Sequence, residues 1–565
     1  MGWKIDAATR TKYFADGLAQ RAMDPKKFAA EVPASAYFID GAGWCRKFCV
    51  KRTSPATVVA RSLRFVHTGA RVMVCWERPG LMFEARDAVR AKRSATPRTA
   101  AALRDRLAAY VRSCREPAMA AIVVGAGLDD LVTDAEAFLD TLPGNPKDFT
   151  IQQIEGCAEH LQRLHDKIDP KIAATIDENP PIMPLPLDWQ DAFDRPIVKP
   201  ALVGALVRGV KRWARDTLSG AETDQIVMAM PSGDVWRWPA LPSPPVLPGL
   251  EGAGDKRKRP IVPSEMDKAT VAEIERESWT SGWQAAVSHI VVASKKRVGY
   301  GEGEMACFQA LKAAARGAGA RGRKARRVWV DPRAEEHPGA PPGSFEAVYA
   351  SGDTDCFIQA IPVLADVRLH VVYATVKLDA KTGIVYRSTA RPKGGSRAAP
   401  ASAKPMCEAV NLSACYGQLC IDHPFHVVLG CVLTAATDYS KGLGGYGLYK
   451  APMLARARDA AAPIMARRGP AKKTSFIVNV DKLRRYLAGV KRDRRSETKI
   501  DEFLAELRHC IFTAAYFCYV YADRPRAGPT MADVPSIKSG GAKTITQWLS
   551  KRGGKGEEVL VGPEA

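Results

Sequence analysis

The sequence predicts an α/β protein with a central, mostly parallel sheet and helices on both faces. Two short apolar runs near the N-terminus support this fold. The first, AYFIDGAG, ends as a strand at Asp40, and the second, ARVMVCWERPG, ends at Pro79 and Gly80. A helical pattern over Thr57–Thr68 separates them, and the order strand, helix, strand is typical of a right-handed parallel crossover. A third run, Phe345–Ala350, indicates another buried strand.

Composition narrows the function. The chain has 565 residues, enough for two or three domains, and 46% of them are hydrophobic, enough for a substantial core. Its formal net charge of +22 indicates a polyanionic partner, because such a charge attracts phosphates and releases counterions on binding. The sequence has no apolar run of 18 residues and no signal-peptide core in MGWKIDAATR, so we expect a soluble, intracellular protein without a membrane partner.

The cysteines do not indicate a secreted or zinc-binding protein. Their number, thirteen, is odd, and they are scattered along the chain, unlike a disulfide framework. The densest group, Cys415–Cys431 with His423 and His426, contains no CxxC spacing.

The elements between the first strands and the middle of the chain are mostly helical. Residues 83–115 are basic, and Arg86, Arg90 and Arg93 fall on one helix face. That face is either solvated or grips phosphates, and we favour the second interpretation. Residues 116–235 have helical patterns, and the proline-rich, charged residues 236–263 indicate a linker.

Two pairs of acidic residues flank the segment from Tyr300 to Phe357. Asp353 and Asp355 follow the strand Phe345–Ala350, and residues two apart at a strand end point to the same face. Glu302 and Glu304 lie at a glycine-punctuated turn, with Glu304 in the first turn of a predicted helix. Crowded carboxylates require a compensating cation, and oxygen ligands favour Mg²⁺ or Mn²⁺. The structural alternative is that Glu304 and Asp355 simply begin helices.

The second half contains a predicted helix through Leu364, strands within residues 368–388 and a helical run over residues 423–436. The run leads into TDYSKGLGGYG, residues 437–447. Repeated glycines after an apolar helix let backbone amides approach a phosphate, and they also make tight turns. The remaining residues are basic and helical up to Tyr521, and a tail follows.

These ordered blocks resemble the flap-endonuclease/XPG group of structure-specific 5′ nucleases. FID with Asp40 is similar to the family's first metal aspartate, AKRS at 91–94 to the start of its helical arch, GEGEMAC to its paired-glutamate motif and GDTDCF to its paired-aspartate motif. TDYSKGLGGYG resembles its last aspartate and its DNA-binding hairpin. The blocks cover about a third of the chain. GEGE is also similar to the Xrn-type 5′-to-3′ exoribonucleases, which share the catalytic core.

The resemblance implies a PIN-like nuclease core, two Mg²⁺ ions (with Mn²⁺ as a substitute) and a set of site residues. The implied metal ligands are Asp40, Glu302, Glu304, Asp353, Asp355 and Asp438. Arg86 and Arg93 would act on the scissile phosphate in catalysis. The nucleic-acid-binding residues would be Lys92, Lys441, Gly442, Gly444 and Gly445.

The chain departs from the family pattern after the second strand. Trp76 occupies the position of a family aspartate, and Glu77 follows it as a substitute ligand or a bystander. We favour the bystander, because a strand-end residue one place along points to the opposite face.

The resemblance also implies an organisation along the chain. The predicted regions are an N-terminal nuclease region with the start of the arch (1–115), a helical insertion with its proline-rich linker (116–287), an internal nuclease region (288–366), a strand-rich insert with a flexible tract (367–405), a region with the last metal aspartate, the hairpin and basic helices (406–525) and a tail (526–565).

The function expected from these features is metal-dependent hydrolysis of phosphodiesters in flap or branched DNA, with roles in DNA repair and replication. The alternatives are an Xrn-like exoribonuclease acting on RNA and a catalytically impaired nucleic-acid-binding scaffold. In a eukaryote or a nucleus-replicating virus, this function implies a nuclear location. In the tail, Ile545, Trp548 and Leu549 have the spacing of a sliding-clamp-binding peptide, or they form an exposed amphipathic turn.

Overall fold

The structure is a computed structural model, and its chain divides into two compact units. Unit 1 comprises residues 1–44, 65–87 and 219–565, and unit 2 comprises residues 45–64 and 88–218. The structure describes residues 36–66, 69–78, 99–219, 225–239, 282–294, 302–315, 345–352, 355–364, 367–378, 385–387, 404–412, 424–434, 437, 440, 458–459, 462–463, 465–468, 475–478 and 500–517.

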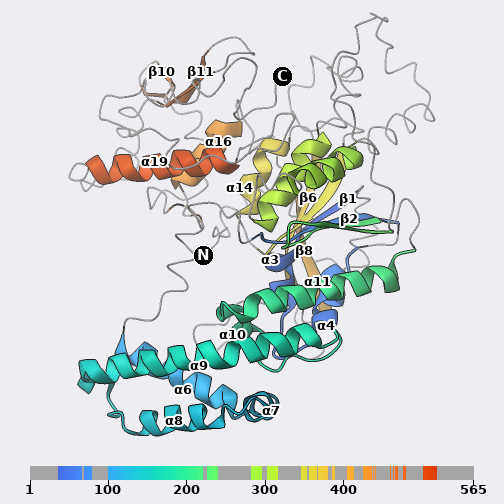
Figure 1. The fold of residues 1–565 in the computed structure, drawn as a ribbon. Coiled ribbons are helices and arrows are strands. Elements are labelled where there is room, and N and C mark those ends of the chain that lie inside the picture. The colour runs from blue at the N-terminus through green and yellow to red at the C-terminus, as the bar shows by residue number, and fades with distance from the viewer. Residues whose placement is uncertain are drawn as a thin grey trace, which may run out of the picture. The chain divides into compact units, whose positions relative to one another are not determined.

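Unit 1 contains a mixed, mostly parallel sheet of eight strands. The strands are β1 (Ala36–Asp40), β2 (Arg71–Cys75), β3 (Gln225–Ala229), β4 (Val235–Trp238), β5 (Phe345–Ala350), β6 (Val367–Leu378), β7 (Val385–Arg387) and β8 (Lys404–Asn411). Their order is β4-β3-β2-β1-β5-β6-β7, and β8 also pairs with β6 (Figure 1). The inner strands β3, β2, β1, β5 and β6 pair in parallel, and β4, β7 and β8 are antiparallel.

Alternation along β1 sends neighbouring side chains to opposite faces of the sheet. The ring of Phe38 packs edge-on against Trp283 of the helix formed by residues 282–294, with 6.2 Å between centroids. Tyr37 contacts Phe65 instead, at 5.7 Å. On β5, Tyr349 is the register partner of Phe38 and packs against Phe308 of helix 303–315 at 4.6 Å. Helices 282–294 and 303–315 therefore cover the face of the sheet that carries Phe38 and Tyr349.

A second group of helices belongs to the C-terminal half of unit 1. It contains α14 (Cys356–Ala360), the 3-10 helix η6 (Ile361–Val363), α16 (Pro424–Thr434) and α19 (Ile500–Phe517). Helix α16 packs against α14, η6 and α19. Two short antiparallel pairs, β9 (Arg458–Asp459) with β10 (Ala462–Pro463) and β11 (Met465–Arg468) with β12 (Ser475–Val478), lie outside the central sheet.

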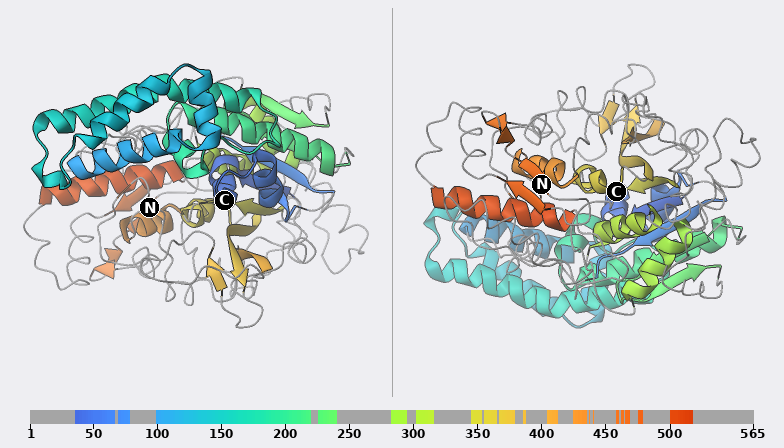
Figure 2. Two further views of the ribbon diagram at one scale, coloured as in Figure 1. Left: turned by 90° about the horizontal axis from the view of Figure 1, so that it is seen from below. Right: turned by 90° about the horizontal axis from the view of Figure 1, so that it is seen from above.

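Unit 2 is helical throughout its described residues. Its elements are η2 (Arg46–Phe48), α4 (Pro55–Leu63), α6 (Ala100–Cys114), α7 (Pro117–Gly125), α8 (Asp129–Asp140), η4 (Pro146–Asp148), α9 (Ile151–Glu178), α10 (Trp189–Asp194) and α11 (Val198–Thr217). The long helix α9 begins with a capping box formed by Thr150 and Gln153. Helices α6 and α11 both pack against α9, and the long helices of this unit lie side by side (Figure 2).

Asp169 is the centre of a buried polar network in unit 2. Its carboxylate accepts a hydrogen bond from Tyr110 Oη at 2.7 Å, lies 2.7 Å from His165 Nδ1 and pairs with Arg195 Nη1 at 3.0 Å. The Arg195 guanidinium also lies over the Tyr110 ring, 4.0 Å from its centroid. These contacts join α6 to α9 and to the residue that follows α10, so a single carboxylate connects three parts of the unit.

The structure confirms the predicted α/β class and the predicted strands that end at Asp40 and Ala350. The second predicted strand is also present, but it ends at Cys75, earlier than the end that Pro79 and Gly80 indicated. The prediction of helix for residues 116–235 is wrong at its end, because residues 225–229 form β3. The cause is the ambiguity of short apolar runs: periodicity alone does not distinguish a buried strand from a helical segment of five residues. The predicted linker 236–263 is wrong at its start, because β4 covers Val235–Trp238. Strand β6, predicted within a separate insert, belongs to the central sheet.

Candidate active site

The candidate site is built around Asp40 at the carboxyl end of β1. The side chain is 8% exposed, and α3 (Gly41–Cys45) begins directly after it. A carboxyl group at the end of a central parallel strand has the position in which open α/β sheets bind ligands. It also has the position of a helix cap, so location alone does not distinguish a functional from a structural role.

Two glycines fit tightly against the Asp40 carboxylate. A Cβ atom added to Gly43 would lie 2.0 Å from Asp40 Oδ2. One added to Gly303 would lie 2.8 Å from Asp40 Oδ1 and 2.4 Å from the carbonyl oxygen of Cys75. A side chain at Gly43 would displace the Asp40 carboxylate, and one at Gly303 would also meet the backbone of β2, so glycine lets both segments approach Asp40 closely. The GEGE turn, which is far from Asp40 in sequence, therefore lies directly against it.

The two glutamates of this turn occupy the predicted positions at the start of helix 303–315. Glu302 immediately precedes the helix and is 4% exposed, whereas Glu304 lies in the first turn and is half-buried. Ser351 Oγ donates a hydrogen bond to Glu304 Oε1 at 3.3 Å. Because Ser351 directly follows β5, this bond joins the glutamate turn to the strand end that precedes the aspartate pair.

A third contact brings the ends of β1 and β5 together. A Cβ atom on Gly352 would lie 2.1 Å from the carbonyl oxygen of Gly43. The residues after β1, the residues after β5 and the start of helix 303–315 thus meet around Asp40. The structure brings Asp40 and Glu304 into this neighbourhood, together with Glu302, which precedes Gly303.

Beneath the carboxylates lies a layer of buried, weakly acidic side chains. The pKa of the Tyr349 phenol is raised by burial and then by the negative charges of Glu304 and Asp40. Burial also raises the pKa of the Cys307 thiol, with further contributions from the Cys75 thiol and the same two carboxylates. Both groups therefore stay protonated near neutral pH, and both are close enough to Asp40 and Glu304 to be affected by their charges.

Strand β2 places a thiol beside Asp40. Cys75 is the register partner of Asp40 and is fully buried. Trp76 is 1% exposed, and its ring lies 2.7 Å from the position of a Cβ atom on Gly41, so the indole packs against the start of α3. Glu77 is partly exposed. The end of β2 thus carries a thiol and an indole. The choice between metal ligand and bystander for Glu77 stays a prediction.

Asp355 immediately precedes α14 and is 1% exposed. Its carbonyl oxygen accepts hydrogen bonds from the amides of Ile358 and Gln359, but its side chain makes no capping hydrogen bond to the helix. The simple capping role considered for Asp355 from the sequence is therefore not observed.

The remaining predicted site residues lie outside the described residues. They are the metal ligands Asp353 and Asp438, the phosphate-contacting Arg86, Lys92 and Arg93, the hairpin residues Lys441, Gly442, Gly444 and Gly445, and the tail residues Ile545, Trp548 and Leu549. Two residues of the motif TDYSKGLGGYG, Thr437 and Ser440, are described. They form a turn in which the Ser440 amide donates to Thr437 Oγ1 at 3.1 Å.

Sequence reasoning missed Ser351, Cys75, Tyr349 and Gly43. Ser351 could have been found from its place directly before GDTD, because it ends the strand that leads to the aspartate pair. The other three have no local signal, since a cysteine, a tyrosine or a glycine beside a strand end is common in cores.

Among the described residues, no group of three or more His, Cys, Asp and Glu side chains is arranged to hold a metal ion. That search did not cover Asp353 and Asp438. In the same part of the chain, no helix is both long and apolar enough to cross a membrane. Comparison with protein-family models, curated proteins and solved structures found no match. The nuclease-family resemblance therefore stays a prediction based on the motifs.

Proposed function

We propose that this chain is a metal-dependent nuclease with a PIN-like, 5′-nuclease core that hydrolyses phosphodiesters in flap or branched DNA. The main observation behind the proposal is that the GEGE turn and the residues after β5 meet at Asp40. Gly303 lies directly against the Asp40 carboxylate, and Ser351 donates a hydrogen bond to Glu304. Motifs more than 250 residues apart in sequence meet at the strand ends, where such a site is expected.

The donor set suits a hard divalent cation. Asp40, Glu302 and Glu304 offer carboxylate oxygens, and the proposed set is completed by Asp353, Asp355 and Asp438. Magnesium is the proposed ion, as a pair, with manganese as a substitute. Bound there, the ions would activate water and stabilise the leaving oxygen.

The protein's own residues would position and shield this chemistry. Ser351 restrains the Glu304 carboxylate, and Gly43 and Gly303 hold the Asp40 carboxylate from two sides. The protonated Tyr349 and Cys307 add no negative charge beneath the acidic groups. Arg86 and Arg93 are the proposed phosphate contacts, and they would offset charge that develops in the transition state.

One observation favours a second candidate function, a nucleic-acid-binding scaffold with impaired catalysis. Beside Asp40, β2 carries Cys75 and then Trp76 in place of the aspartate expected from the resemblance. The scaffold would bind the same nucleic acids and would not cleave them. A sliding clamp, bound through Ile545, Trp548 and Leu549, is a further proposed partner of either form.

The test is cleavage of three labelled substrates, 5′-flap DNA, nicked duplex and 5′-phosphorylated RNA, in Mg²⁺ and in EDTA. We expect Mg²⁺-dependent cleavage of the flap and a fall of at least about a thousandfold in Asp40→Asn and in Glu304→Gln, as is typical when a charge that acts in the transition state is lost. Glu346→Gln, at the amino end of β5, is the matched control and should cleave normally.

Each outcome selects one function. Cleavage confined to the RNA would favour the Xrn-like exoribonuclease. Binding without cleavage would identify the scaffold. Full activity of Asp40→Asn and Glu304→Gln would overturn the proposed site.

A further inference from the structure

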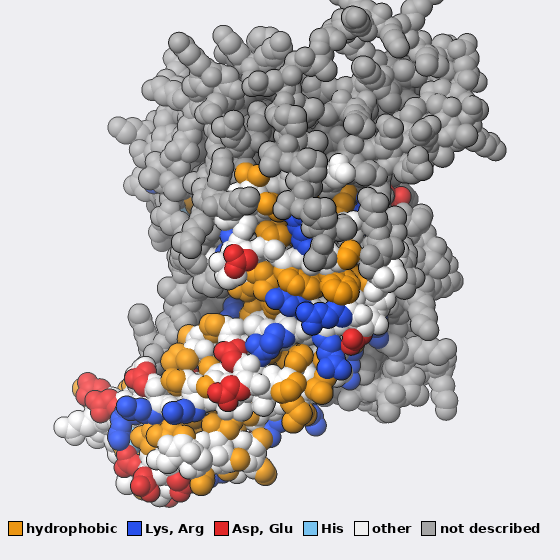
Figure 3. All heavy atoms as spheres, turned by 45° about the vertical axis from the view of Figure 1, so that its right-hand side comes forward, with side chains coloured by type: hydrophobic (Ala, Val, Ile, Leu, Met, Phe, Trp, Pro, Cys, Tyr) orange, Lys and Arg blue, Asp and Glu red, His pale blue; other side chains and the backbone are white. Residues whose placement is uncertain are grey.

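The charged residues of unit 2 are segregated between its elements. Residues 45–64, which include α4, contain six Lys and Arg and no acidic residue. Helix α11 has five basic residues and one acidic residue, Asp216, whereas α8 has five acidic residues and no basic one. In Figure 3, Lys and Arg side chains form a group near the middle of the described surface, and Asp and Glu side chains gather at its lower end.

Four basic residues of α11 form one stripe. Arg208, Lys211, Arg212 and Arg215 follow one another at i, i+3, i+4 and i+7, so they share a face of the helix. Arg212 and Arg215 are exposed, and Arg208 and Lys211 are partly exposed. The opposite side of the helix is buried in the unit, so this stripe is the side that α11 presents outward.

Two residues of the stripe have acidic neighbours within the unit. Arg208 lies 3.4 Å from Asp177 and donates to the carbonyl oxygen of Ile176, and Arg212 lies 3.4 Å from Asp216 on its own helix. Both contacts are long for ion pairs, and the four groups are at least a third exposed, which makes such pairs weak.

The acidic residues of α8 are engaged elsewhere. Asp129 and Glu136 both pair with Arg115, each at 2.6 Å, and Asp134 pairs with Arg163 at 3.2 Å. These three carboxylates thus pair with arginines that lie outside α11.

Helix α11, which carries the stripe, packs closely against α4. Gly209 lies between Arg208 and the remaining stripe residues, and a Cβ atom there would approach Val59 and Pro55 of α4 to 3.1 and 3.4 Å. Helix α4 thus packs closely against α11. Arg61 of α4 and Arg64, which follows this helix, add basic residues to the element next to α11. A preformed set of cations with fixed spacing suits a regular polyanion, because few side chains need to be ordered on binding.

We propose that the stripe of Arg208, Lys211, Arg212 and Arg215 is a nucleic-acid-binding face that contacts the phosphodiester backbone of the substrate. The inference rests on the proposed function for the identity of the polyanion. Because the proposed contacts are to phosphates, the stripe would supply affinity without sequence preference.

The experiment compares two triple charge reversals in the full-length chain. The stripe variant is Lys211→Glu, Arg212→Glu, Arg215→Glu. The control is Lys147→Glu, Lys167→Glu, Lys171→Glu, which changes the net charge by the same amount at exposed positions of η4 and α9. Binding of labelled duplex and 5′-flap DNA is measured by anisotropy across salt concentrations, without divalent metal so that cleavage does not interfere.

We expect the stripe variant to bind at least tenfold more weakly in moderate salt, and its plot of log affinity against log salt should be shallower by roughly 2 to 3, the value for about three lost phosphate contacts. The control variant should stay within about threefold of the parent with an unchanged slope. If the stripe variant melts at a lower temperature than the parent, the triple substitution by Gln at the same positions replaces it, with the same expected direction.

Equal weakening in both variants would assign the effect to net charge and overturn the proposal, as would unchanged binding in the stripe variant. Binding of the parent to vesicles of phosphatidylserine and phosphatidylcholine, without binding to DNA, would overturn it in favour of a membrane surface. A parent that binds DNA through the stripe and does not cleave it would leave the inference intact while rejecting the proposed nuclease activity.

Discussion

Asp40 and Asp169 are both buried carboxylates, but the side chains around them differ in charge. Burial is the largest influence on the pKa of Asp169 and raises it, yet the hydrogen bonds from His165 and Tyr110 and the charge of Arg195 together hold that pKa below its ordinary value. Near Asp40, by contrast, a second carboxylate on Glu304 adds negative charge. Burial raises the pKa of Tyr349 and of Cys307, and the charges of Asp40 and Glu304 raise it further.

The difference separates a structural carboxylate from a functional candidate. Asp169 connects helices of unit 2 through polar partners that the chain supplies, so its ionised form contributes to stability. Asp40 lies near the carboxylate of Glu304 and against close-fitting glycine backbone, and acidic groups gathered at a strand end are typical of functional sites.

The largest expected effect is on stability in unit 2. Asp169→Ala removes the acceptor for Tyr110 and the partner of the buried Arg195, so we expect a loss of about 3–5 kcal/mol in the free energy of unfolding. Urea denaturation measures it. Asp40→Asn should change stability by less than about 1 kcal/mol, because it keeps the side-chain size and relieves repulsion. Equal losses in the two variants would break the comparison.

Acid titration sharpens the same contrast. The folded pKa of Asp169 lies below its unfolded value of about 3.9, so its stabilisation is fully present above pH 3.9. It should disappear as the pH falls from there through the folded pKa. The stability difference between the parent and Asp169→Asn should therefore narrow progressively below about pH 4. A difference that stays constant to pH 2 would contradict the lowered pKa.

A smaller effect is expected from the glycine beside Asp40. Gly303→Ala places a methyl group 2.4 Å from the carbonyl oxygen of Cys75, so the backbone must shift, at a cost of roughly 1–3 kcal/mol. The same shift displaces Asp40 and should raise the Mg²⁺ concentration required for cleavage. Gly125→Ala, at a position with no atom within 4 Å, is the control and should be neutral or stabilising. Two variants with equal melting temperatures would show that the turn tolerates a side chain.

The smallest effect concerns the Tyr349 hydroxyl, which is buried and has no hydrogen-bond partner among the described residues. Tyr349→Phe removes a buried polar group that makes no hydrogen bond to the described residues, so we expect the free energy of unfolding to stay unchanged or to rise by up to about 1 kcal/mol. Urea denaturation of the two proteins measures the difference. A loss of more than about 1 kcal/mol would show that the hydroxyl has a partner in the folded protein.

The sequence predicted the local parts of this fold well. Short continuous apolar runs bounded by turn residues locate β1, β2 and β5, and a carboxylate at the end of such a run, as at Asp40, is visible without a structure. The placement of Glu302 before a helix and Glu304 in its first turn is confirmed for the same reason.

The remaining features depend on contacts between distant segments. The sequence does not indicate that Gly303 would lie against Asp40, or that Cys75 would be its register partner, because strand order and register are properties of the assembled sheet. Ser351 was missed since its role depends on Glu304, which approaches it from another helix. The sequence predicts helix for the residues of β3, because its apolar run is too short to show a period, and a linker for most of β4, because prolines and charges follow it closely.

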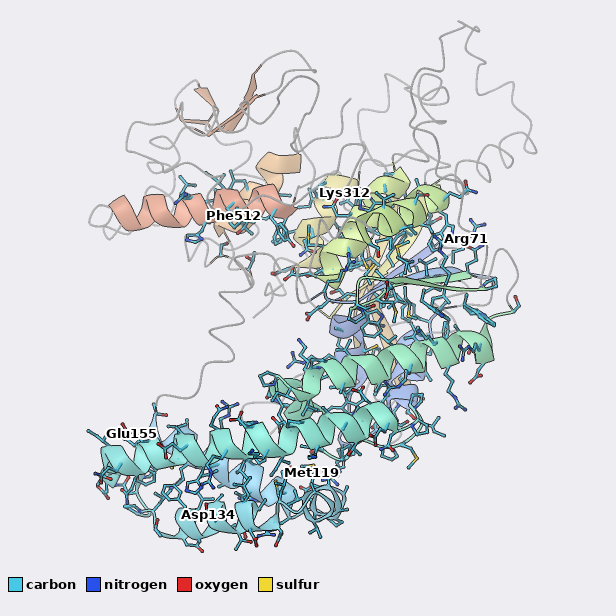
Figure 4. All side chains as sticks on the ribbon, in the orientation of Figure 1. Arg71, Met119, Asp134, Glu155, Lys312 and Phe512 are labelled. Atoms are coloured by element: carbon cyan, nitrogen blue, oxygen red, sulfur yellow. The ribbon has the colours of Figure 1, made fainter. Side chains whose placement is uncertain are left out.

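Lys312, labelled in Figure 4, gives helix 303–315 a second point of attachment. Its buried ammonium group donates to the carbonyl oxygen of Phe517 at the end of α19, at 3.2 Å, where a cation also complements the helix dipole. Glu304 and Lys312 stand on one rigid helix, about 12 Å apart along its axis. The helix that carries Glu304 is therefore attached at both ends, to Ser351 after β5 near its start and to the end of α19 near its last turn.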